Sequence, residues 1–130
     1  MSPEIAVWWD KIRELSLGFP PGAYTIVQDG LRHTAEQMAE HREEGTLQSR
    51  HVTGQELCLG IRDFAIDQFG LLARTVLEGN GIRRTEDIGR IVFALVDVGL
   101  MRKTDEDCLE DFQGVFDFDD AFGTPLRVNS

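Results

Sequence analysis

Three histidines are the side chains best suited to acid–base chemistry or metal binding near neutral pH: His33, His41 and His51. His33 and His41 stand eight residues apart, and neither belongs to a Glu-x-x-His pair of the kind that di-iron helical bundles use. His51 precedes Thr53, where it could orient the start of a helix. A metal-dependent enzyme would have to assemble its site from distant histidines and acidic residues, and this stays open as an alternative function.

Motifs for nucleophilic catalysis and phosphate binding are missing from the sequence. No serine lies in a GxSxG elbow or beside a histidine, and the Gly79-Asn80-Gly81 turn lacks the lysine and the spacing of a P-loop. Cys58 and Cys108 are fifty positions apart and form no CxxC pair, so we expect two buried free thiols instead of a zinc or redox site. The sequence therefore predicts no catalytic, cofactor-binding or metal-binding residues.

The negative charge of the chain is concentrated near its C-terminal end. The 130 residues include 23 acidic and 13 basic side chains, which gives a net charge of -10. Residues 105–120 hold eight acids and no base: Asp105, Glu106, Asp107, Glu110, Asp111, Asp117, Asp119 and Asp120. This acidic segment lacks the ligand spacing of a calcium-binding loop. We expect it to form an exposed surface that repels polyanions.

Two other groups of residues could contact a partner. A basic turn places five bases within twenty-one residues just before the acidic segment, and ion pairing with that segment is their simplest role. Near the start of the chain two tryptophans are adjacent, and only one of them can lie at the centre of a helix's core-facing stripe, so the other is a candidate anchor. The candidate partner-binding residues are Trp8, Trp9, Arg83, Arg84, Arg90, Arg102, Lys103, Asp105, Glu106, Asp107, Glu110 and Asp111.

The elements that position these residues are predicted to be helices of a single domain spanning residues 1–130. Apolar residues recur at helical spacing within about 3–17, 22–42, 54–69, 71–78 and 85–98. Thr53 and Glu56 fit a capping box at the start of the third stretch, and Thr85 is expected to cap the fifth. Residues 43–50 are polar, and we expect a mobile surface loop there.

The region after residue 98 allows two interpretations. Residues 100–104 and the alternating run at 115–119 fit a small β-hairpin, whereas Leu109, Phe112 and Phe116 also fit a helical period. We therefore predict a mainly α fold, a compact domain of about five helices with a possible C-terminal β-hairpin.

Several motifs resemble those of a family of small uncharacterised bacterial proteins of about this length. They are HVTGQEL at 51–57, GIRRTEDIGRIVF at 81–93 and FDFDDAF at 116–122. The resemblance covers nearly the whole chain but departs at residues 17–21, and it implies no activity, cofactor or active site. More weakly, the cadence of the second half resembles a winged helix, which would imply nucleic-acid binding. Such a wing would be acidic here, so nucleic acid is an unfavoured partner.

The sequence as a whole favours a non-catalytic protein-interaction module with an unknown protein partner. The longest uninterrupted apolar run covers only residues 91–96, against about 20 residues for a membrane-spanning helix. No secretory signal is visible, so we expect a cytoplasmic protein. A winged-helix-like nucleic-acid-binding regulator and a metal-dependent enzyme are the two alternatives.

Overall fold

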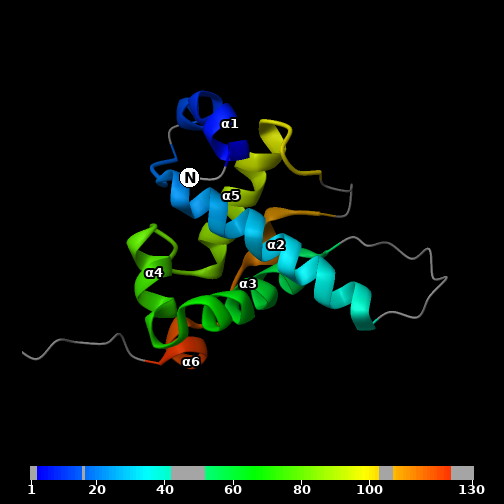
Figure 1. Ribbon diagram of the computed structural model, residues 1–130, viewed down its shortest axis with the longest axis vertical. Helices are drawn as coiled ribbons and strands as arrows, with labels where there is room; N and C mark the ends of the chain where they lie inside the picture. Colours follow the sequence, from blue (N-terminus) through cyan, green and yellow to red (C-terminus); the bar gives the residue numbers. More distant parts are fainter. Residues whose placement is uncertain (1–2, 16, 42–51, 103–106, 124–130) are drawn as a thin grey trace, which may run out of the picture.

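The computed structural model describes residues 3–15, 17–41, 52–102 and 107–123, and helices form nearly all of its regular structure (Figure 1). The α-helices are α1 (Pro3–Glu14), α2 (Pro21–His41), α3 (Gly54–Phe69), α4 (Ala73–Gly79), α5 (Thr85–Asp97) and α6 (Phe118–Phe122). Two 3₁₀ turns complete them: η1 (Gly70–Leu72) between α3 and α4, and η2 (Leu109–Phe112) before α6. The prediction of a mainly helical fold is confirmed. The expected loop at 43–50 lies outside the described residues.

The helix starts are set by side chains close in sequence. Thr53 caps α3 as predicted, because its hydroxyl accepts the Glu56 N–H while the Glu56 carboxylate accepts the Thr53 N–H. The predicted cap at Thr85 is wrong, since Arg84 is the N-cap of α5 and makes no capping hydrogen bond through its side chain. The Asp87 carboxylate instead reaches back to accept the Arg83 N–H at 2.9 Å. Thr85 is thereby free to bond elsewhere.

The longest helix, α2, packs mainly on α3 and also contacts α5 and α1 (Figure 1). The α2–α3 crossing is close because glycines stand at both sides of it. A Cβ at Gly30 would lie 2.6 Å from the Ile61 side chain, and a Cβ at Gly60 would overlap the Thr34 hydroxyl. That hydroxyl is buried and donates to the Gly30 carbonyl at 2.7 Å. The sequence needs glycine here because no larger residue fits the contact.

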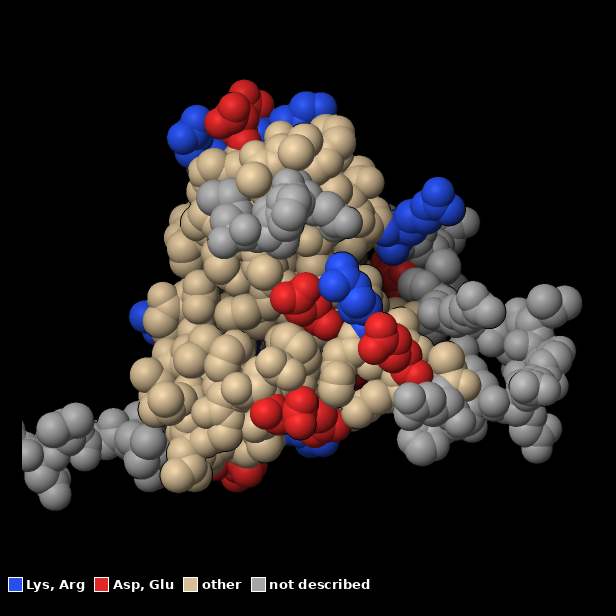
Figure 2. Space-filling model, in the orientation of Figure 1, with Lys and Arg blue, Asp and Glu red and all other residues tan. Residues whose placement is uncertain are grey.

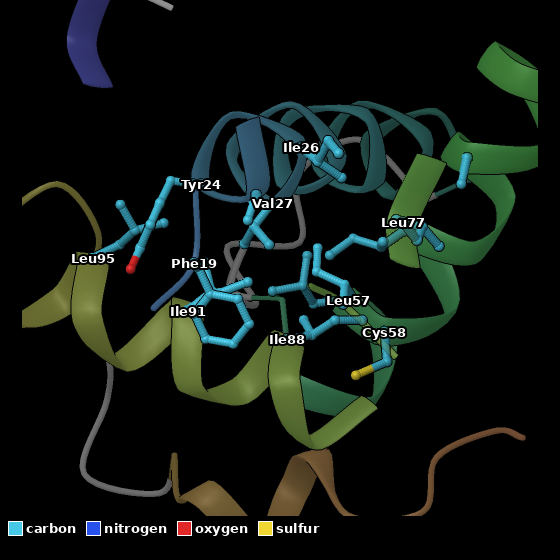
Figure 3. Packing of buried hydrophobic residues seen from close by; sticks show 14 of the residues in the cluster. Phe19, Tyr24, Ile26, Val27, Leu57, Cys58, Leu77, Ile88, Ile91 and Leu95 are labelled. Carbon is cyan, nitrogen blue, oxygen red and sulfur yellow. The ribbon is translucent and has the colours of Figure 1, made fainter. Parts of the chain in front are cut away.

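The core lies between α2, α3, α4 and α5. Figure 3 shows Val27 of α2 and Leu57 of α3 directed toward Ile88 and Ile91 of α5, all of them buried. Of the apolar residues predicted at helical spacing over 85–98, Ile88, Ile91 and Leu95 are fully buried, and Val92 and Val98 are half-buried. Among the helices of the described residues, none has the length and hydrophobicity to cross a membrane.

The predicted β-hairpin is absent from the described part of the chain, where residues 115–119 form a bend and the start of α6. The Asp117 carboxylate accepts the Asp119 N–H and so begins a helix inside the expected strand. The alternating phenylalanines pack on one another instead of lying on one face of a sheet. The rings of Phe116 and Phe118 stack at 5.6 Å, and Phe122 meets both edge-on.

We predict that Gly60→Ala lowers the free energy of unfolding by about 1–3 kcal/mol, because the new methyl group must displace Thr34 from its place in the α2–α3 crossing. Urea denaturation monitored by circular dichroism measures the change. Gly79→Ala is the matched control, since a Cβ at Gly79 would meet nothing within 4 Å. Equal stability of the two variants would contradict the close crossing.

Candidate functional site

Of the three histidines considered for a metal or acid–base site, only His33 has a described side chain. His33 lies on α2, where its ring packs against Phe64 of α3 at 5.6 Å between centroids. The side chain of His41 and the whole of His51 lie outside the described residues. Among the residues that are described, no three His, Cys, Asp or Glu side chains are gathered as a metal site would require.

Both tryptophans are half-buried. Trp9 meets the buried ring of Tyr24 edge-on at 6.0 Å, so it joins α1 to α2. Trp8 lies under the ammonium group of Lys11, 4.5 Å from the ring centroid. Val7 of the same helix is 77% exposed. A role of either tryptophan as an anchor for a partner stays a prediction.

The two cysteines differ in environment. Cys58 is fully buried as predicted, and burial raises the pKa of its thiol to about 12. Cys108 is exposed, so the prediction that it is buried is wrong. It stands at the start of η2, where its N–H donates to the Asp111 carboxylate. Desolvation and the side chains of Glu110 and Asp111 raise the pKa of its thiol, although a hydrogen bond from the Asp111 backbone opposes the change.

The predicted basic turn does not stay together as one patch. Arg90 lies over the Phe19 ring at 5.4 Å and pairs with Asp87 at 3.5 Å. Arg102 lies beyond the other end of α5, a helix about 20 Å long. There it lines a small apolar cavity of about 50 Å³ together with Asp107. Lys103 lies outside the described residues, which leaves Arg83 and Arg84 as neighbours at the start of α5.

The acidic segment is tied to the start of α5 by a buried hydroxyl. Thr85 Oγ1 donates to the Phe112 carbonyl at 2.6 Å and accepts the Val115 N–H at 3.2 Å. The Phe112 ring fills a space at two glycines: a Cβ at Gly54 or Gly89 would come within 3.0 Å of its side chain. Asp111 and the exposed Glu110 belong to this η2 turn, whereas Asp105 and Glu106 lie outside the described residues.

This attachment forms a groove of about 480 Å³ between the turn before α5 and the segment leading into α6. We call it the arginine groove. It is lined by Arg74, Arg83, Arg84, Glu86, Gly114, Phe116, Asp117, Phe118 and Asp119. The groove brings part of the predicted basic turn near part of the predicted acidic segment, but among the described residues neither Arg83 nor Arg84 forms the expected ion pair with that segment.

Arg74 of α4 holds one wall of the arginine groove in place. Its guanidinium bonds to Glu78 at 3.1 Å, to the Asp119 carboxylate and to the Gly123 carbonyl at 2.6 Å. The hydrogen bond to Asp119 is the main cause that raises the pKa of Arg74. Arg74 was not among the residues predicted to be functional, although its spacing from Glu78 is that of a helical i,i+4 ion pair.

A second surface lies at the corner between α3 and α4. We call it the apolar ridge and define it as Ile66, Leu71 and Leu72, which are 44%, 87% and 55% exposed. The Gly70 N–H donates to the Ile66 carbonyl, and a positive φ at Gly70 then turns the chain so that both leucines follow directly. Both leucines were predicted to lie in a helix over 71–78, and their exposure was not predicted.

Comparisons of the chain with protein-family models, with curated proteins and with solved structures found no match. The resemblance to a small bacterial family therefore rests on the sequence motifs alone.

We predict that one thiol per chain reacts with Ellman's reagent under native conditions, because Cys108 is exposed and Cys58 is buried. Reaction of Cys108 should be slower than that of free cysteine, since its pKa is raised. Cys108→Ser should leave no reactive thiol until the protein is unfolded in guanidinium. Two fast thiols in the native wild type would contradict the burial of Cys58.

We predict that Thr85→Val lowers the free energy of unfolding by about 1–3 kcal/mol, because it leaves the Phe112 carbonyl and the Val115 N–H without their partner. Hydrogen exchange at the Val115 amide should accelerate as well. The matched control is Thr75→Val on an exposed face of α4, which should change stability by less than about 0.5 kcal/mol. Unchanged exchange at Val115 would show that the hydroxyl does not hold the segment.

Proposed function

We propose that this protein is a non-catalytic protein-interaction module of the cytoplasm, and that it binds its partner through the apolar ridge. The observation that carries the proposal is the exposure of adjacent leucines in η1, at 87% for Leu71 and 55% for Leu72. Single exposed apolar residues are common on protein surfaces, whereas neighbouring ones on a rigid turn are typical of a contact site.

The surroundings of the apolar ridge resemble the anatomy of an interface. Figure 2 shows a mostly uncharged surface over α4 and the adjoining end of α3, with acidic and basic groups at its edges. Interfaces commonly have such an apolar centre and a charged rim. Arg74 follows two residues after Leu72 and is held by three acceptors, so the backbone that carries the leucines is well supported.

The charge of the chain favours a partner with basic residues. Asp67 follows Ile66 on an exposed face of α3, Asp119 lies across α4 on α6, and the net charge is -10. A partner that places an apolar surface on the ridge and basic side chains around it would satisfy both features. Because ion pairs at an exposed rim are screened, its binding should weaken with salt.

Nucleic-acid binding has less support. Arg90, an exposed base on α5, is engaged by Asp87 and by Phe19. Asp117 and Asp119 lie in the same groove as Arg83 and Arg84, and a nucleic acid would bring a run of several phosphates against these carboxylates. We therefore retain protein interaction as the proposed function.

We predict that the double variant Leu71→Ser with Leu72→Ser loses about 2 kcal/mol or more of partner-binding free energy, roughly a thirtyfold weaker dissociation constant. The immobilised wild type should retain from cell extract a protein that the double variant does not. The melting temperature should be unchanged, since both leucines are exposed.

The control for this experiment is Val7→Ser, which removes an exposed apolar residue from α1, outside the ridge. It should retain the same partner as the wild type. Capture that is equal for all three proteins, or absent from all of them, would refute a role of the apolar ridge.

A further inference from the structure

We propose that the arginine groove binds a small phosphate monoester, with the phosphate on Arg83 and Arg84 and the organic group against Phe116. This inference is independent of the apolar ridge and of the interaction proposed for it. The groove, at about 480 Å³, falls within the range of roughly 300–1,000 Å³ that is usual for small-molecule sites.

The acidic side chains of the groove are already occupied by groups of the protein. Glu86 accepts the Gly114 N–H at 3.5 Å, and at 3.1 Å it shares the one proton of the Thr85 hydroxyl with the closer Phe112 carbonyl. Asp117 accepts the Asp119 N–H, and Asp119 accepts from Arg74. Although desolvation opposes the change, hydrogen bonds from backbone amides and from Thr85 lower the pKa of Glu86, so it stays ionised and engaged.

The basic side chains of the groove are occupied unequally. Arg74 is fully engaged, but Arg83 and Arg84 are exposed and form no ion pair within 4.0 Å with any group of the described residues. The two arginines therefore line an open groove without a salt bridge, although Arg84 interacts electrostatically with Glu86. A phosphate dianion is the ligand that two such groups match best, because each can donate two parallel hydrogen bonds to its oxygens.

The site consists of side chains and does not depend on the end of α5. The first turn of that helix is already closed by Asp87, which accepts the Arg83 N–H, and by Glu86, which bonds its own backbone amide. The free positive charge thus lies on the two guanidinium groups. Their charge reaches the groove directly.

The remaining lining restricts what the ligand can be. Glu86, Asp117 and Asp119 would repel a second or third phosphate at Debye-length distances, which disfavours polyanions and favours a single phosphate group. Phe116 is half-buried and stacks on Phe118, so it offers an apolar wall for the organic part of the ligand. An aromatic or aliphatic phosphate monoester meets both conditions.

Titration of the isotope-labelled full chain with phenyl phosphate, followed by amide chemical shifts, tests this assignment. The amides of Arg83, Arg84, Gly114 and Val115 should shift together and saturate. Phenyl phosphate should bind at least about fivefold more tightly than inorganic phosphate, which lacks the ring, and than benzoate, which carries one charge. Arg83→Gln and Arg84→Gln should each weaken binding by about tenfold or more.

Arg102→Gln is the matched control, because it removes the same charge at the far end of α5 and should leave the affinity unchanged. Circular dichroism of each variant establishes that it is folded. Absence of saturable shifts at millimolar phenyl phosphate would overturn the proposal, as would equal weakening by all three substitutions. Tighter binding of a phosphoserine peptide than of phenyl phosphate would identify the ligand as a phosphorylated protein. That result would also overturn the proposal.

Discussion

The hydroxyl of Thr85 is the contact on which the second half of the molecule depends. It is fully buried, and it joins the first turn of α5 to the Phe112 carbonyl and the Val115 N–H, nearly thirty residues later in the chain. The Phe112 ring enters the space left by Gly54 and Gly89, so one residue connects α3 and α5 with the C-terminal segment. This contact holds the two walls of the arginine groove opposite each other: the turn before α5 and the segment leading into α6.

Arg74 gives the other end of the C-terminal segment a similar attachment. It joins α4 to Asp119 and to the Gly123 carbonyl, while the leucines of the apolar ridge lie just before it in the chain. The apolar ridge and the arginine groove therefore share one supporting side chain, although they expose different chemistry. An ion pair so little exposed on the arginine side is worth more than a freely solvated surface pair.

Some features that depend on neighbours in sequence were predictable, whereas the local cap at Asp117 and the contacts between distant groups were not. The capping box of Thr53 and the buried stripe of α5 follow from spacing alone. Thr85 looked equally like a cap, but its hydroxyl bonds to a carbonyl that no local pattern reveals. Phe116 and Phe118 alternate with polar residues as in a strand, but in the structure their rings stack on each other. Asp117, which lies between them, begins a helix. The arginine groove was not predicted; the sequence indicated only that the basic turn and the acidic segment could form ion pairs.

The close packing of Phe112 against Gly54 and Gly89 makes the side chains that are tolerated at these three positions depend on one another. Two of them are glycine because the third is aromatic, and a methyl group at Gly89 would occupy volume that the ring now fills. Along an evolutionary lineage, a larger residue at 89 becomes acceptable only after position 112 holds a smaller side chain, whereas one at 54 must also be accommodated by Asp111. The three sites should consequently vary in concert, and the order of their substitutions would be constrained.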